Sequence, residues 1–146
     1  MAEWIANEQQ IVAPGESIVF SVAAVPYAYG LIYHRDGSGI FRLRGVGACP
    51  YCRSARYNVR FGANIAVPAD GTAEEISIAI SQDGEPLPTS EARVTPAAVE
   101  EFFNVNAFAG IAFPIWAPTM ISVRNTSTQD ILVENANLVI TLDRVA

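Results

Sequence analysis

The sequence has no lysine and a single histidine, and it carries few charges of either sign. Its nine basic residues are all arginines, and they stand against fifteen acids, which gives a net charge of −6. Binding to phosphate backbones needs a basic surface, so we do not expect nucleic acid as a partner. Lysine is disfavoured and arginine favoured at subunit interfaces, so its absence suits a chain whose surface is largely covered.

The sequence also lacks a long apolar run. The longest uncharged stretch, residues 104–123, contains prolines, asparagines and a glycine and alternates as strands do, so we expect no membrane insertion. Residues 1–8 show neither the basic nor the apolar region of a secretory signal. We therefore expect synthesis in the cytoplasm and a final location on a virion, a spore surface or an extracellular filament.

Glycine and proline separate short apolar runs along the whole chain, and many runs alternate apolar with polar residues. Such alternation is typical of half-buried strands. In residues 75–81, for example, Ile76, Ile78 and Ile80 share one face. Segments 31–35 and 40–44 flank the sequence Asp-Gly-Ser-Gly, which predicts a hairpin because glycine readily adopts positive φ.

Turn signals recur every ~8–12 residues, which is the spacing found in β-sandwiches. We predict an all-β jelly-roll sandwich of about eight to ten antiparallel strands, including one strand over residues 17–25 and a final pair over 131–134 and 137–142. At most one short helix is expected, starting at Pro96. The jelly roll spans residues 15–146, and residues 1–14 form either an N-terminal arm or an edge strand.

Two segments carry a family resemblance. One is residues 76–90, in which an apolar strand and a turn precede Gly-Glu-Pro-Leu-Pro-Thr-Ser; the other is the tail, residues 133–141, with Asn-Ala-Asn-Leu-Val. They resemble the C-terminal domains of bacterial collagen-like glycoproteins of the exosporium, and small domains of phage particle proteins, within the tumour necrosis factor/complement globular-head superfamily. The resemblance implies a jelly roll that forms a tight homotrimer around an aromatic and aliphatic axis. This sequence departs from the family in having no Gly-x-y collagen stalk.

Composition independently favours self-association. Hydrophobic residues make up 51% of the chain, which is more apolar surface than one small core hides, so we expect the excess to be buried between subunits. The candidate interface residues are the arm anchors Trp4 and Ile5 and an aromatic-rich stretch, Phe102, Phe103, Phe108, Phe113 and Trp116. The alternative is that these aromatics fill the core of the single chain.

Six arginines fall within a short segment: Arg35, Arg42, Arg44, Arg53, Arg56 and Arg60. They either meet acids of another subunit, such as Glu74, Glu75, Glu100 or Glu101, or form a solvated sheet face.

Cys49-Pro-Tyr-Cys52 has the spacing of a redox motif, but no βαβ unit surrounds it. A disulfide between Cys49 and Cys52, free thiols, or one metal site shared between subunits are the alternatives. The lone His34 and the turn acids Asp70, Asp83 and Asp130 do not form a metal-binding pattern. We expect no cofactor and no metal.

These observations lead to a non-enzymatic structural protein, a self-assembling and most simply homotrimeric jelly-roll subunit of a phage particle, spore surface or filament. Its partners are copies of itself and other particle or surface proteins. The alternative is a carbohydrate- or receptor-binding module, in which loop aromatics hold the ligand. Its candidate residues are Tyr27, Tyr29, Tyr33 and Tyr51.

Overall fold

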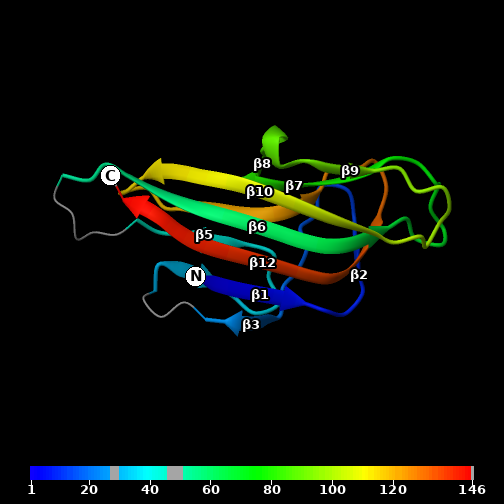
Figure 1. Cartoon of the computed structure of the whole chain (residues 1–146), viewed down its shortest axis with the longest axis horizontal. Helices are drawn as coiled ribbons and strands as arrows, with labels where there is room; N and C mark the ends of the chain where they lie inside the picture. Colours follow the sequence, from blue (N-terminus) through cyan, green and yellow to red (C-terminus); the bar gives the residue numbers. More distant parts are fainter. Residues whose placement is uncertain (27–29, 46–50, 146) are drawn as a thin grey trace.

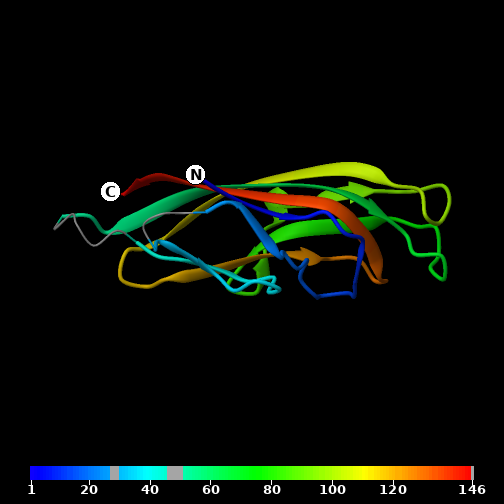
Figure 2. The same ribbon diagram turned by 90° about the horizontal axis from the view of Figure 1, so that it is seen from below.

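The computed structural model describes residues 1–26, 30–45 and 51–145, which fold into a β-sandwich (Figure 1). Two antiparallel sheets lie face to face, as the view from below shows (Figure 2). The predicted all-β jelly-roll sandwich is therefore confirmed.

The first sheet, called the β6 sheet, contains the longest strands. Its order is β10 (Phe103–Pro114), β6 (Ser54–Ala66), β12 (Ile131–Val145), β1 (Ala2–Ala6) and β3 (Val22–Val25), and β2 (Gln10–Val12) also pairs with β12. The second sheet, called the β7 sheet, has the order β4 (Ile32–His34), β5 (Phe41–Leu43), β11 (Thr119–Asn125), β7 (Ile76–Gln82) and β8 (Glu85–Pro86). Strand β9 (Ala92–Val94) also pairs with β7, and a 3-10 turn, η1 (Pro88–Ser90), joins β8 to β9.

The core lies between the sheets and is rich in aromatic and branched side chains. Alternation along β6 turns Tyr57 and Phe61 inward, and Phe20 and Phe41 meet them from the other side. The rings of Phe20 and Phe41 lie 5.6 Å apart, and those of Trp4 and Phe41 lie 4.8 Å apart, both edge to face. Burial of each such side chain contributes about 1.5–3 kcal/mol, so one chain already has a substantial core of its own.

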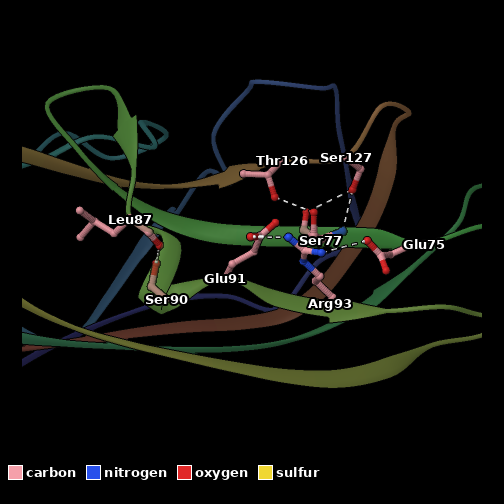
Figure 3. A network of polar contacts seen from close by, with 8 residues as sticks. All are labelled: Glu75, Ser77, Leu87, Ser90, Glu91, Arg93, Thr126 and Ser127. Atoms are coloured by element: carbon pink, nitrogen blue, oxygen red, sulfur yellow. Dashed lines mark hydrogen bonds and ion pairs between the residues drawn. The ribbon is translucent and has the colours of Figure 1, made fainter.

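Strand β7 is covered on both faces. Ile76, Ile78 and Ile80 enter the core as predicted, but Ser77, Ala79 and Ser81 are buried as well. The turn after β11 reaches back to β7, where Ser77 Oγ and Thr126 Oγ1 lie 2.6 Å apart and Ser77 N–H donates to Ser127 Oγ at 2.7 Å (Figure 3). Small side chains are required on this face because neighbouring segments pack closely over it.

Residues 95–102 form bends and turns, so the segment that starts at Pro96 is not helical, which agrees with the prediction of at most one short helix; so short a segment gains few helical hydrogen bonds before Phe103 enters β10. Two details of the predicted strands are wrong. The strand expected over 17–25 is limited to Val22–Val25, because Ser17 bridges to Arg124 of the β7 sheet before the chain crosses to the β6 sheet. The two strands expected over 131–134 and 137–142 are parts of one strand, β12. A bulge lies between them, and in it Asn135 has a φ of 51°.

Residues 1–14 contribute β1 and β2. Both strands pair with β12 in the β6 sheet, and β1 also pairs with β3. Within the described ranges, no helix has the length and apolar character needed to cross a bilayer.

Candidate functional site

The outer face of the β6 sheet combines an aromatic ring, aliphatic side chains and amides. Antiparallel pairing places Phe108 beside Arg60 and Arg60 beside Val139, so the three form one row across β10, β6 and β12. Phe108 is 50% exposed, and the Arg60 guanidinium lies over its ring at 5.6 Å from the centroid. Such cation–π contacts contribute about 0.5–1 kcal/mol at exposed sites.

The next rows on this face are formed by asparagines. Asn106 donates to Asn104 Oδ1 at 3.1 Å, and Asn104 donates to Asn64 Oδ1 at 3.1 Å. Gly62 lies between Asn106 and Asn137, where an added Cβ would come within 3.0 Å of Asn106 Oδ1 and 2.9 Å of Asn137 Oδ1. The ladder leaves amide groups that can hydrogen-bond a partner without bringing a charge into the contact.

Charged side chains also lie on this face. Arg60 is in the Phe108 row, Glu3 of β1 is in register with Val139 in that row, and Glu134 is in register with Asn64. Arg56 lies beside Gly110, where an added Cβ would be 3.0 Å from the guanidinium, and pairs with Asp143 at 3.6 Å. Both partners of this ion pair are substantially exposed, so it contributes little to stability. We call Phe108, Arg60, Val139, Asn104 and Asn106, with their neighbours Asn64, Gly62, Asn137 and Ile5, the amide face.

The structure divides the candidate interface residues into two groups. Trp4 and Phe113 are 5% exposed and lie in the core of the single chain, so they are not available to a second subunit. Ile5 is half-buried in the outward rows of β1 and Phe108 is on the amide face, whereas Phe102 is half-buried just before β10. Phe103, 36% exposed, and Trp116, 73% exposed, lie at opposite ends of the β10 segment.

The candidate ligand-binding tyrosines are separated in space. Tyr27 and Tyr29 lie outside the described residues, as does Cys49. Tyr51 is 91% exposed, next to Cys52, which is disulfide-bonded. Tyr33 instead lies on the outer face of the β7 sheet, where it is 63% exposed.

Around Tyr33 the surface is hollowed and rich in arginine. Arg42 is in register with both Tyr33 and Met120 across β4, β5 and β11. A depression of about 200 Å³ there is lined by Tyr33, Arg35, Ser38, Ile40, Arg42 and Met120. A second depression of about 340 Å³ shares Ile40 and Met120 and extends to Asp83 and Arg124. We call the two together the arginine trough.

The sequence indicated Tyr33 as a candidate ligand-binding residue and Arg42 as part of an arginine cluster, but not that Met120 and Arg124 lie near them. The alternation Phe41-Arg42-Leu43, with apolar residues buried on either side of an exposed arginine, is a signal that Arg42 faces outward. No local signal shows that β11 lies beside β5, because that pairing joins segments far apart in the sequence.

The arginines expected to meet acids have few carboxylate partners within the chain. Among the described residues, only Arg56 and Arg93 form ion pairs. A hydrogen bond to Glu91, together with the charges of Glu91 and Glu75, raises the pKa of Arg93 (Figure 3). Arg35 and Arg42 in the trough have no carboxylate within 4.0 Å in this part of the chain, and neither does Arg124.

His34 and Asp83 have structural partners within the chain. The His34 ring stacks on Phe41 with centroids 4.1 Å apart, and its Nε2 lies 2.8 Å from Ser38 O. Asp83 accepts hydrogen bonds from Thr119 Oγ1 at 2.9 Å and from Met120 N–H at 3.0 Å. In the ranges that the structure covers, no group of three or more His, Cys, Asp or Glu side chains is placed to hold a metal ion.

Comparison with solved structures identifies the fold. The globular domain of zebrafish complement 1qA protein superposes with a TM-score of 0.61, over 99% of this chain and 98% of that chain, at 10% sequence identity. The chain has the complement globular-head jelly-roll fold. This confirms the fold implied by the resemblance of residues 76–90 and 133–141, and at this identity the jelly roll alone is shown.

Two carbohydrate-binding structures match less closely. The sugar-binding C-terminal domain of EclA gives a TM-score of 0.41 at 12% identity, over 93% of this chain and 79% of that one. The xylan-binding domain CBM22-1 of Paenibacillus barcinonensis Xyn10C gives 0.37 at 10% identity, over 99% and 94%. Neither match is close enough to bear on this jelly roll's function. No protein-family model matches the sequence, and no curated protein matches it.

Proposed function

We propose that this jelly roll is a non-enzymatic structural subunit that assembles with copies of itself into a homotrimer. The observation that carries the proposal is the amide face, where Phe108 is half exposed on an otherwise ordered and regular sheet. An exposed aromatic ring beside an arginine suits a protein interface, because aromatic residues and arginine are enriched there. The proposed number of subunits, three, is taken from the resemblance to the complement globular-head superfamily.

The chemistry of the amide face suits contact with another protein. Phe108 and Val139 supply apolar area, and the amides of Asn104 and Asn106 supply hydrogen bonds that need no charged partner. Arg60 is suited to an interface because guanidinium is weakly hydrated and stacks on aromatic rings. A three-fold ring brings one patch of each subunit against a different patch of the next and then closes.

We further propose that the assembled protein is displayed on a virion, a spore surface or an extracellular filament, in contact with other particle or surface proteins. A trimer of rigid sandwiches would present its loops outward and needs no cofactor for such a role.

The test compares two substitutions of equal chemistry on opposite sheets. Phe108→Glu places a charge in the proposed contact, so the mass measured by light scattering should fall to that of one chain. Met120→Glu places the same charge on the β7 sheet at a residue of similar exposure, 48% against 50%, and should leave the trimer intact. Equal masses for the two variants would contradict the use of the amide face.

A second function, carbohydrate binding, is favoured by one observation. Tyr33 is 63% exposed and lines a depression, which is the arrangement by which aromatic rings hold sugars. A glycan array should retain the wild-type chain and lose the Tyr33→Ala variant. An array on which no sugar retains the protein would remove this function.

A further inference from the structure

The arginine trough contains three arginines that form no ion pair with a described residue of the chain. Arg35, Arg42 and Arg124 line it, and none has a carboxylate within 4.0 Å among the described residues. This is unusual in a chain with a net charge of −6, where acids outnumber arginines. The trough is therefore a local basic site on an acidic protein.

The acid that lines the trough is already engaged. Both carboxylate oxygens of Asp83 accept hydrogen bonds, one from Thr119 Oγ1 and the other from the Met120 N–H. Arg124 donates to Ser122 Oγ at 3.4 Å and to Gly15 O at 3.3 Å, which are neutral acceptors. The guanidinium groups thus retain donors for an anion from outside, and their planar fork suits carboxylate and sulfate groups.

Apolar surface lies between these arginines. Tyr33 is 63% exposed, and Ile40 and Met120 are 47% and 48% exposed. The flat ring of Tyr33 suits the apolar face of a pyranose, while the neighbouring Arg42 would reach a charged substituent of the same sugar. The two depressions share Ile40 and Met120 in their linings, so they lie side by side on the outer face of the β7 sheet, which favours a chain of sugars over a single one.

We propose that the arginine trough binds an anionic polysaccharide, one whose sugars carry carboxylate or sulfate groups. This inference rests on carbohydrate binding, the second function proposed above, and is independent of the trimer. Tyr33 stacks on a sugar ring, Arg42 and Arg35 pair with its anionic group, and Arg124 holds the next charged sugar along the trough.

An acidic segment of another copy is a weaker occupant. Two of the candidate acids already have partners, since Glu75 pairs with Arg93 at 3.6 Å and Glu74 Oε1 accepts from Gln129 at 3.3 Å. A peptide also offers no pyranose face for Tyr33. Poly-L-glutamate serves as the probe for this alternative.

The experiment is affinity electrophoresis of the assembled protein in gels that contain polygalacturonate, dextran sulfate, neutral dextran or poly-L-glutamate. The two anionic polysaccharides should retard the wild type, and added salt should weaken the retardation. Arg42→Gln should weaken binding about tenfold, because it removes a charge-assisted contact. Arg93→Gln, which removes an arginine outside the trough, should bind as the wild type does. For each variant, a thermal melting curve tests whether the fold is kept, and a mass measurement tests whether the assembly is kept.

Each other outcome overturns a defined part of the proposal. Equal retardation by neutral dextran would contradict the anionic class while leaving carbohydrate binding in place. If no polysaccharide retards the protein, both the anionic class and carbohydrate binding are contradicted. The trimer is tested separately, by the mass of the protein. Retardation by poly-L-glutamate as strong as by polygalacturonate would favour an acidic protein partner, and an unchanged Arg42→Gln would place the binding outside the trough.

Discussion

Single side chains join the two sheets at points that the sequence does not reveal. Asn125 is 1% exposed at the end of β11, and all its polar atoms are used. Its Nδ2 donates to Val12 O at 2.9 Å and to Gln129 O at 2.8 Å, and its Oδ1 accepts from Ser127 N–H at 2.8 Å. Residues 125–127 match a glycosylation sequon, but in this conformation the amide nitrogen is buried and fully bonded.

Asn125→Asp tests how much this side chain contributes. The carboxylate loses both donors and faces two carbonyl oxygens in a buried site, so the free energy of unfolding at pH 7 should fall by about 3 kcal/mol. Asn7→Asp, at an exposed loop position, is the control and should change stability little. Urea unfolding followed by tryptophan fluorescence measures both. A loss for Asn125→Asp no greater than that of the control would show that the buried amide is unimportant.

At the scale of elements, local sequence signals predicted where strands occur, but they did not predict which strands lie side by side. The hairpin at Asp36–Gly39 was predicted correctly from its glycines. Gly37 has a φ of 83°, a conformation that glycine adopts freely. The outward turn of Phe108 and Arg60 follows from alternation alone. Their meeting on one row, and the meeting of Tyr33, Arg42 and Met120, depends on register between distant segments, which no single segment encodes.

The bulge in β12 provides a prediction for one element. Asn135 adopts a φ of 51°, where asparagine and glycine are tolerated and β-branched residues are not. Asn135→Val should lower the free energy of unfolding by about 1–2 kcal/mol, whereas Asn135→Gly should keep most of the wild-type stability. Thermal unfolding compares the two variants. If valine were tolerated as well as glycine, the left-handed conformation at this residue would be contradicted.

At the scale of the whole molecule, composition alone left open whether the aromatics fill one core or join several subunits. The structure shows both kinds: Trp4 and Phe113 are enclosed in the single chain, and Phe108 and Trp116 are not. The sequence predicted the sandwich because alternation and turns are local, but it did not distinguish these aromatics because burial depends on which sheet lies opposite. The exposed ones make self-assembly the central claim.

Sedimentation equilibrium of the wild-type chain at micromolar concentration tests that claim most directly. We predict a mass three times that of the 15.7 kDa chain, unchanged on tenfold dilution. A single species with the mass of one chain across the same concentrations would contradict it.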